Sequence, residues 1–202
     1  MCIRDRVYEA PFVIDHTTTV KFIAVRDGLA PSLVSEVELR HRPQDWRIKL
    51  ATRYHRNYTA GGDGALVDGL RGATDFRAGA WQGYEGVDLD AVVDLGEELA
   101  LTRVGAGFLQ DVEWWIFMPT SVTFESSRDG VSFETLGTVK TDVPPDQWDR
   151  VTRDLMLEAR GVRARYVRVI ARNIGECPPD HPGAGGTAFL FTDEILIEGD
   201  KP

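Results

Sequence analysis

Two adjacent tryptophans beside carboxylates form the group of side chains in this sequence with the clearest chemical potential. The segment from Gln110 to Ile116 places Trp114 and Trp115 next to Asp111 and Glu113, between two stretches that alternate apolar and polar residues. Successive side chains of a strand face opposite sides, so at most one of the two indoles can reach a core if this segment is extended. The other must lie in a loop or on the surface. An exposed indole with polar neighbours is suited to stack on the apolar face of a neutral sugar.

A second segment with reactive side chains runs from Pro178 to Gly186, where prolines give way to glycines around a single imidazole, His181. The segment immediately precedes the last strand-like run of the chain. We therefore expect it to form a loop at one end of the sheet that contains this strand. His181 would either contact a ligand or pin the loop through a hydrogen bond to the backbone, and the sequence leaves both roles open.

Trp81 and the polar residues after it form a third group. Trp81 is expected in the core, whereas the side chains that follow on a glycine-flanked segment are expected at the rim of a binding surface. Arg77 can join them, although an exposed salt bridge is the simpler role for it. Gln110 and Asp111 are included for their amide and carboxylate groups. The predicted ligand-contacting residues are Trp114, Trp115, His181, Gln82, Tyr84, Glu85, Gln110 and Asp111.

The loop from Asp68 to Asp75 is rich in oxygen donors and suits a hard cation. Calcium takes roughly six to eight oxygen ligands from carboxylates, hydroxyls and carbonyls. Gly69 and Gly72 allow this loop to turn several carbonyls inward, and the charge of Asp75 makes it a further candidate ligand. The alternative is an Asx turn at Asp68, in which the carboxylate bonds to the backbone of its own loop.

Catalytic motifs are not found in the sequence. The histidines at positions 16, 41, 55 and 181 have no metal-ligand spacing such as HExxH, and no GxSxG nucleophile motif occurs. The glycine-rich stretch 183–186 lacks the lysine and hydroxyl residue of a phosphate-binding loop. Asp111 and Glu113 are residue types that a glycosidase uses, but that chemistry requires two carboxyl groups across a cleft, which sequence spacing cannot establish. The pattern favours binding over catalysis.

Length and composition indicate one full domain plus a fragment. The chain has 202 residues and 43% hydrophobic content, enough for one substantial core and part of a second. Its formal charge of −9 repels phosphate backbones and anionic lipid, which argues against nucleic-acid binding and peripheral membrane attachment. No apolar run approaches the roughly 18 to 20 residues of a membrane span. Cys2 and Cys177 form no CxxC pair and indicate no disulfide framework.

The first 44 residues differ from the rest. They predict three short strands, at 7–14, 18–25 and 33–39, with a turn at Asp27 and Gly28. Three strands cannot close a stable sandwich by themselves. Residues 1–6 fit this pattern poorly, look like a sequencing or assembly scar and lack a secretory signal, so we expect the natural chain to extend upstream. We therefore divide the chain into a partial β-domain at 1–44 and a second domain at 45–202.

Alternating apolar and polar residues dominate from residue 45 onward. The runs are short and are bounded by Gly, Pro and Asp, which is typical of an antiparallel β-sandwich. Predicted strands include 91–95, 101–108, 121–126, 166–171 and 189–197.

Several of these segments together resemble the coagulation factor 5/8 type C, or discoidin, domain, a family that includes carbohydrate-binding module family 32. The residues that carry the resemblance are Val67–Gly69, Asp94–Gly96, Ser127–Phe133, Ala164–Val169 and Asp193–Ile195. Further strings resemble the version at the C-terminus of bacterial family 20 glycoside hydrolases, the β-N-acetylhexosaminidases; they are Tyr58–Gly62, Trp81–Gly86, Gly107–Asp111 and His181–Gly186. The segment from Tyr8 to Ser35 resembles the end of the fibronectin-like domain of chitobiase and β-hexosaminidase chains.

The resemblance implies an all-β fold, namely an eight-stranded jelly-roll β-sandwich with ligand-binding loops at one end, preceded by a partial fibronectin-like segment. It also implies a structural calcium ion. By position the calcium ligands would be Asp68, Thr74 and Glu194, to which Asp75 is added on grounds of charge. Leu70 stands where the family usually has Asn or Asp, and the hydroxyl residue lies one position late.

We therefore expect a non-catalytic carbohydrate-binding module. Its partners would be a glycan of galactose or N-acetylhexosamine type and a catalytic glycoside hydrolase domain in the same, longer bacterial protein, which would be secreted, periplasmic or bound to the cell surface. Nucleic acid and membrane insertion are not expected. The alternative is a structural module that packs against its catalytic domain through Trp114 and Trp115 and binds no sugar. Adhesion to protein or lipid, as in some discoidin relatives, fits the negative charge less well.

Overall fold

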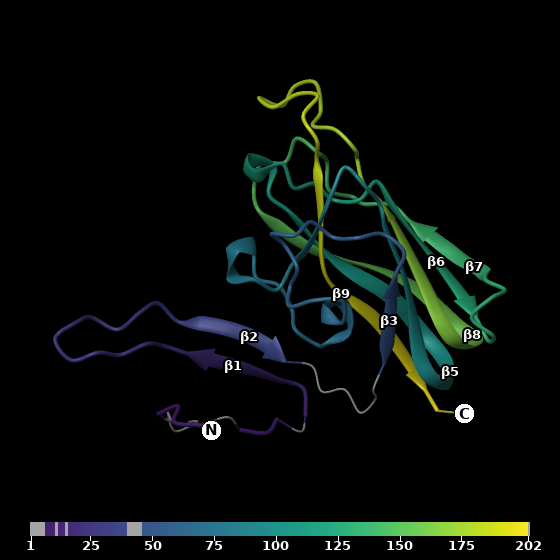
Figure 1. The fold of residues 1–202 in the computed structure, drawn as a ribbon, viewed down its shortest axis with the longest axis horizontal. Coiled ribbons are helices and arrows are strands. Elements are labelled where there is room, and N and C mark those ends of the chain that lie inside the picture. Colours follow the sequence, from purple (N-terminus) through teal and green to yellow (C-terminus); the bar gives the residue numbers. More distant parts are fainter. Residues whose placement is uncertain (1–6, 11, 15, 40–45, 202) are drawn as a thin grey trace.

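A computed structural model describes residues 7–10, 12–14, 16–39 and 46–201 (Figure 1). This part of the chain contains strands and three single-turn 3-10 helices but no α-helix, so the predicted all-β class is confirmed. None of these helices is long or apolar enough to cross a membrane. The strands are β1 (Thr18–Phe22), β2 (Ser35–Leu39), β3 (Arg47–Leu50), β4 (Gln82–Glu85), β5 (Leu89–Gln110), β6 (Ser121–Ser127), β7 (Glu134–Val139), β8 (Val151–Arg172) and β9 (Phe189–Asp200), and the 3-10 helices are η1 (Ala65–Val67), η2 (Phe76–Ala78) and η3 (Val112–Trp114).

Seven of the strands form one antiparallel sheet that folds into two layers (Figure 1). One layer contains β3, the first part of β5, the last part of β8, β6 and β7. The other contains β4, β9, the last part of β5 and the first part of β8. The predicted jelly-roll sandwich is confirmed. It differs from eight separate strands because β5 and β8, each 22 residues long, take part in both layers.

The sequence of β5 shows how one strand can serve both layers. The register between β5 and β8 shifts after Asp94 and again between Leu101 and Arg103. A shift of one residue exchanges the two faces of a strand, so the second shift keeps apolar residues inside as the strand turns. The buried residues of β5 are Leu89, Ala91, Val93, Leu95, Leu99 and Leu101 before this shift, and Val104, Ala106 and Phe108 after it.

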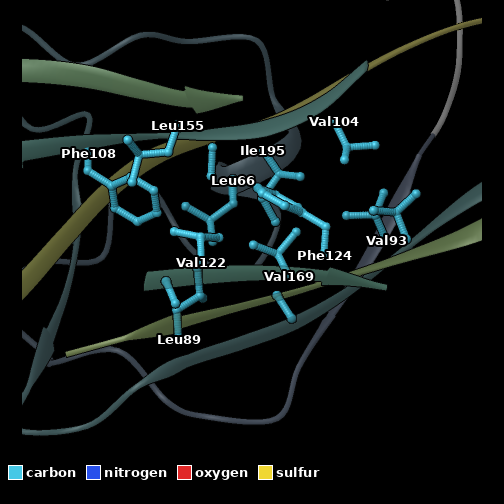
Figure 2. Close-up of a cluster of buried hydrophobic side chains, with 14 of the residues drawn as sticks. Leu66, Leu89, Val93, Val104, Phe108, Val122, Phe124, Leu155, Val169 and Ile195 are labelled. Atoms are coloured by element: carbon cyan, nitrogen blue, oxygen red, sulfur yellow. The ribbon is translucent and has the colours of Figure 1, made fainter. Parts of the chain in front are cut away.

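The main hydrophobic core lies between the two layers. Figure 2 shows Val104, Leu155 and Ile195 facing Leu89 and Val169, which come from the opposite layer. All five side chains are at most 6% exposed. Burial of an aliphatic side chain of this size contributes roughly 1.5–3 kcal/mol to stability, so this core is the main source of the energy that holds the sandwich together.

Strands β1 and β2 form a separate two-stranded sheet, in which Thr18 pairs with Leu39 and Phe22 with Ser35. An ion pair joins Lys21 Nζ to Glu36 Oε2 at 2.8 Å. Several apolar side chains of this region are largely exposed, among them Val7, Val13, Phe22, Val25, Leu29 and Leu33. This small sheet therefore has little core of its own.

The strand predicted at 7–14 is wrong for the described residues, none of which is in a strand there. A strand forms only where a neighbour supplies backbone partners, and proline in the segment removes one donor. The boundary predicted at 44/45 and the predicted scar at 1–6 lie outside the described residues. The fibronectin-like character of the N-terminal segment stays a prediction.

A bulge in β9 turns two carboxylates inward next to β5. Ala106 pairs with Ile195 and Phe108 with Thr192, so the two residues Asp193 and Glu194 lie opposite Gly107 alone. Both carboxylates are 1% exposed. An extra residue in one strand of a pair re-aims the neighbouring side chains, which explains why two successive acidic residues are both buried.

Asp193 anchors the loop that connects η1 to η2. Arg71 Nε and Gly72 N each donate to Asp193 Oδ2 at 2.8 Å. The Arg71 guanidinium also pairs with Asp154 of β8, so one side chain links the loop to two strands on either side of β5. Burial raises the pKa of Asp193, and the positive charge of Arg71 acts against this rise. The paired guanidinium thereby offsets part of the cost of burying this carboxylate.

The substitution Gly107→Ala tests the importance of this cluster. A Cβ at position 107 would lie 2.2 Å from Asp193 Oδ1 and 2.6 Å from Arg71 Nη2. These atoms cannot move away without disturbing the ion pair, so we expect the free energy of unfolding to fall by about 1–3 kcal/mol. Gly64→Ala is the control, since a Cβ there would have no neighbour within 4 Å and the backbone φ is −81°. Urea unfolding curves that show equal stability for the two variants would contradict the prediction.

Candidate functional site

Loops meet at one end of the sandwich, where β5 ends and where β8 and β9 begin. Isolated bridges join Asp111 to Ile116 and Ile116 to Phe189, and a further bridge closes the last loop between Glu176 and Thr187. The segment with the paired tryptophans therefore lies beside the glycine-rich loop of His181. The fold brings together two segments that are about 65 residues apart in the sequence, because the end of β5 adjoins the start of β9.

Trp114 and Trp115 lie in a tight turn rather than in a strand. Trp114 ends η3, and Trp115 has a left-handed backbone with a φ of 62°. The Trp114 ring meets Phe76 edge-on at 5.9 Å between centroids, whereas the Trp115 ring meets His181 at 6.3 Å. Both indoles stay partly open to solvent, at 49% and 39% exposure. Neither reaches the core, in agreement with the prediction that at least one would lie at the surface.

Trp115 rests on the glycine-rich loop. A Cβ on Gly183 or Gly186 would lie 2.5 Å from an atom of the indole, so a larger residue at either position would displace the ring. The carbonyl of Trp115 accepts a hydrogen bond from Phe189 N at 2.8 Å, which fixes the turn to the start of β9. The exposed part of Trp115 is therefore held in one orientation by neighbours on its other side.

His181 pins its own loop. Its Nε2 lies 2.9 Å from the carbonyl of Val112, and its Nδ1 accepts a hydrogen bond from Gly183 N at 2.9 Å. These bonds require the neutral tautomer with the proton on Nε2. Because both ring nitrogens are used inside the protein, neither can bond to a ligand without breaking one of these contacts. Of the two roles that the sequence left open for His181, the structure supports the hydrogen bonds that pin the loop. It does not support the predicted direct contact with a ligand.

Trp148 is a site residue that the sequence prediction missed. It lies in the turn before β8, is 53% exposed and stacks on the His181 ring at 5.5 Å with an angle of 7° between the planes. The turn is held by Gln110, whose Nε2 donates to the carbonyls of Pro144 and Gln147 at 2.9 and 3.1 Å. Gln110 Oε1 accepts from Met118 N at 3.2 Å. Gln110 is 1% exposed, so it positions Trp148 and is not the ligand contact that was predicted.

Asp111 is a carboxylate almost completely removed from solvent, at 1% exposure. Its Oδ2 lies 2.8 Å from Arg150 Nε, but the pair is not aligned as a hydrogen bond, and Oδ1 has no hydrogen-bond partner among the described residues. Burial raises the pKa of Asp111, and the charge of Arg150 acts in the opposite direction. Arg150 also reaches Glu113 at 3.7 Å. Next to the exposed tryptophans there is thus an arginine between two carboxylates, one of them with unused hydrogen-bonding capacity.

Gln82, Tyr84 and Glu85 do not lie at the rim where the sequence predicted them. Gln82 and Tyr84 are fully buried, and the Tyr84 hydroxyl donates to Gln82 Oε1 at 2.9 Å. Gln82 Nε2 donates to the carbonyl of Gly62 at 2.7 Å. Glu85 is exposed, and its Oε2 lies 3.6 Å from His55 Nε2. The error arose because β4 pairs with β9 and is covered on both faces, which its short, partly polar sequence does not indicate. Trp81 is buried, as predicted.

The predicted calcium ligands have separate surroundings. Asp68 is exposed and its Oδ1 accepts from Leu70 N at 2.8 Å, which is the Asx-turn alternative. Asp75 pairs with Arg77 at 2.8 Å at the start of η2, Thr74 is exposed, and buried Glu194 accepts from Gly69 N at 3.2 Å. Within residues 7–39 and 46–201 as far as they are described, no group of three or more His, Cys, Asp or Glu could hold a metal ion. These contacts do not support the calcium site, which stays a prediction.

Melting of the protein tests the calcium prediction directly. An ion that binds the folded state alone stabilises it, and the midpoint rises as the ion concentration increases above the dissociation constant. If Asp68, Thr74, Asp75 and Glu194 hold calcium, the midpoint after chelator treatment rises when calcium is added, and Thr74→Ala reduces that rise. Magnesium at the same concentration controls for ionic strength. A midpoint that does not respond to calcium contradicts the prediction.

The chain belongs to the F5/8 type C domain family, whose model matches residues 48–183, more than half of the chain. A search of curated proteins gave no match. The matched segment begins in β3 and includes the tryptophan turn, Trp148 and His181. The resemblance of the sequence to the F5/8 type C family is therefore confirmed. Its resemblance to the modules of family 20 glycoside hydrolases stays a prediction.

Solved structures with a similar fold have low sequence identity to the chain. CpGH89CBM32-5 from Clostridium perfringens, in complex with GalNAc-β-1,3-galactose, is 16% identical with a TM-score of 0.46 over 75% of this chain and 94% of its own. The C-terminal domain of a chitobiase from Bacteroides fragilis is 17% identical with a TM-score of 0.45, over 77% and 93%. A family 89 glycoside hydrolase from Clostridium perfringens, in complex with PUGNAc, is 16% identical with a TM-score of 0.51, over 78% of this chain and 14% of its own. At these identities the likeness concerns the fold alone.

The substitution Asp111→Asn tests whether the buried carboxylate opposes folding. A carboxyl group whose pKa is raised in the folded state stabilises the fold most when protonated, below about pH 3.9, and this contribution is lost as the pH rises through the raised pKa. Asparagine does not ionise. We therefore expect the variant to be at least as stable as the wild type at pH 7 in urea unfolding. As the pH falls toward 3.9, the stability of the wild type should rise relative to that of the variant.

Asp129→Asn is the matched control of opposite sign. Hydrogen bonds from Ser132 N, Val131 N and the Ser127 hydroxyl lower the pKa of Asp129 to about 2. Its stabilising contribution is present above about pH 3.9 and is lost as the pH falls toward 2, so this variant should be less stable than the wild type at pH 7. If Asp111→Asn lost as much stability at pH 7 as Asp129→Asn, the account of Asp111 would be wrong.

Proposed function

We propose that this chain is a non-catalytic carbohydrate-binding module that holds a neutral glycan at the loop end of the sandwich. The observation that carries the proposal is the cluster of half-exposed indoles of Trp114, Trp115 and Trp148 beside the polar groups of Asp111 and Arg150. Monomeric proteins rarely expose several large aromatic rings together unless the surface binds something. Membership of the F5/8 type C family supports a binding role for these loops.

The chemistry of the cluster favours a sugar over other ligands. Indole faces stack on the C–H face of a pyranose, while arginine and carboxylate groups exchange hydrogen bonds with hydroxyls. The formal charge of −9 opposes polyanionic ligands. The ligand class we propose is a glycan with galactose or N-acetylhexosamine units. Because a sugar replaces its bonds to water almost one for one, we expect a dissociation constant of roughly 10⁻⁵ to 10⁻³ M for a single site.

The proposal extends to the protein in which the module acts. The chain spans 14% of the family 89 glycoside hydrolase to which it is similar, so a module of this kind is found within a much longer enzyme. We propose that this chain likewise serves a catalytic glycoside hydrolase domain, in a bacterial protein that is secreted, periplasmic or displayed on the cell surface. Weak binding by the module would keep such an enzyme near its substrate and raise its effective concentration there.

A glycan array followed by calorimetry with galactose, N-acetylglucosamine and N-acetylgalactosamine tests the proposed function. We expect at least one of the three sugars to bind. Trp114→Ala should weaken that binding about tenfold, because loss of one stacking partner costs about 1.4 kcal/mol, and should leave the melting temperature nearly unchanged. Val131→Ala is the control, since Val131 is 82% exposed in the turn between β6 and β7, away from the loops of the site.

The alternative function is a module that packs against its own catalytic domain and binds no sugar. It predicts that every glycan of the array fails to bind to the wild-type chain. It also predicts that Trp114→Ala weakens association with the catalytic domain in place of sugar binding. Either result, with the variant still folded, would overturn the proposed function.

A further inference from the structure

The exposed aromatic rings of the loop end form two separate groups. In the first group, which we call the Trp114 platform, the indole of Trp114 packs edge-on against Phe76 at 5.9 Å. In the second, the Trp148 platform, the indole of Trp148 stacks on His181, and Trp115 stands at 90° to that imidazole. Among the described residues, no ring contact joins the two platforms.

The two platforms are held by different parts of the fold. Trp114 ends η3 and packs on η2, whereas Trp148 lies in the turn before β8. His181, which supports Trp148, is bonded to the carbonyl of Val112 in the same short helix that ends with Trp114. One backbone turn therefore fixes both platforms, and neither can shift far relative to the other without breaking this bond.

Arg150 links the two platforms, because it follows Trp148 by two residues and contacts the two carboxylates that precede Trp114. Asp111 precedes η3, and its Oδ2 lies 2.8 Å from Arg150 Nε, two residues after Trp148. Arg150 is 37% exposed and Glu113 68%, so both can reach a ligand. Asp111 is only 1% exposed, so its role is to hold Arg150 in place from below the surface. A linkage between two sugar units has hydroxyls of both rings on either side of it.

We propose that the site binds two successive units of one glycan, one on the Trp114 platform and one on the Trp148 platform, with Arg150 and Glu113 contacting hydroxyls near the linkage. This proposal rests on the proposed function and adds to it that the ligand is an oligosaccharide. One pyranose covers about one indole face, so a single sugar can use only one platform. A disaccharide uses both and gains the second stacking energy without a second loss of overall translational freedom.

Calorimetry on the whole chain compares single sugars with their oligomers. The probes are N-acetylglucosamine with its β-1,4-linked disaccharide and tetrasaccharide, and galactose with GalNAc-β-1,3-galactose. In at least one series we expect the disaccharide to bind on the order of tenfold more tightly than the single sugar. In that series, the tetrasaccharide should add little over the disaccharide.

The variants Trp114→Ala and Trp148→Ala separate the two platforms. Trp114→Ala should weaken binding of both the single sugar and the disaccharide, whereas Trp148→Ala should weaken only the disaccharide, reducing its affinity to that of the single sugar. Trp148→Leu keeps an apolar contact with His181 and serves if the alanine variant is less stable. Val131→Ala should change nothing.

Three outcomes decide the matter. The split between the variants, with a tighter disaccharide, supports two platforms. If single sugars and oligomers bind with equal affinity, or both variants weaken them by the same factor, the site holds one sugar unit; the proposed function then stands and the two-platform proposal is overturned. If no sugar of any length binds the wild-type chain, the proposed function itself fails.

Discussion

The loop end of this protein depends on the side chain of Gln110, a buried amide at the end of β5. Its nitrogen donates to two carbonyls of the turn before β8, and its oxygen accepts from the backbone that leads into β6. A buried amide is stable only when its polar atoms are paired, so the three bonds tie the three segments together at one point. The adjacent bond between His181 and Val112 adds the glycine-rich loop to the same assembly. Rings carried on loops are thereby held by the rigid sandwich, which reduces the entropy lost when a ligand binds.

Two buried aspartates illustrate different uses of charge in the same fold. Asp193 is matched by Arg71 and by a backbone amide, so it joins a loop to β9, and Arg71 extends this link to β8. Asp111 is matched less completely, since neither of its oxygens has a hydrogen-bond partner among the described residues, whereas Asp193 Oδ2 accepts two hydrogen bonds. A carboxylate kept in such surroundings opposes folding, and groups of this kind are more frequent at functional sites than elsewhere. The contrast is the physical basis for assigning Asp111 to the site and Asp193 to the scaffold.

The sequence predicted the sandwich well because its signals are local. The runs at 91–95, 101–108, 121–126, 166–171 and 189–197 lie within β5, β6, β8 and β9, and each could be recognised from period-two alternation between turn residues. The division of β5 between two layers was not visible, because a register shift depends on the partner strand. The adjacency of the paired tryptophans predicted that at least one of them would be exposed, and both are partly exposed because they lie in a turn. Trp148 and Arg150 were missed, since only the tertiary contact with His181 and Asp111 distinguishes them from ordinary loop residues. Gln82 and Tyr84 were misplaced because polar residues in a short strand look like surface residues until both faces are found to be covered. Gln110 was misplaced because the turn before β8, which is distant in the sequence, covers the end of β5.

The central claim is that indoles at one end of the sandwich bind a neutral sugar while the rest of the molecule stays unchanged. Nuclear magnetic resonance of the five indole N–H groups, recorded during titration with GalNAc-β-1,3-galactose and with the β-1,4-linked disaccharide of N-acetylglucosamine, measures this directly. The account predicts that the signals of Trp114, Trp115 and Trp148 move with at least one of the sugars. The signal of Trp81, whose Nε1 is bonded to the carbonyl of Ala73 inside the fold, should remain in place. Movement of the Trp81 signal with those of the loop tryptophans unchanged, or no movement of any of these four signals, would contradict it.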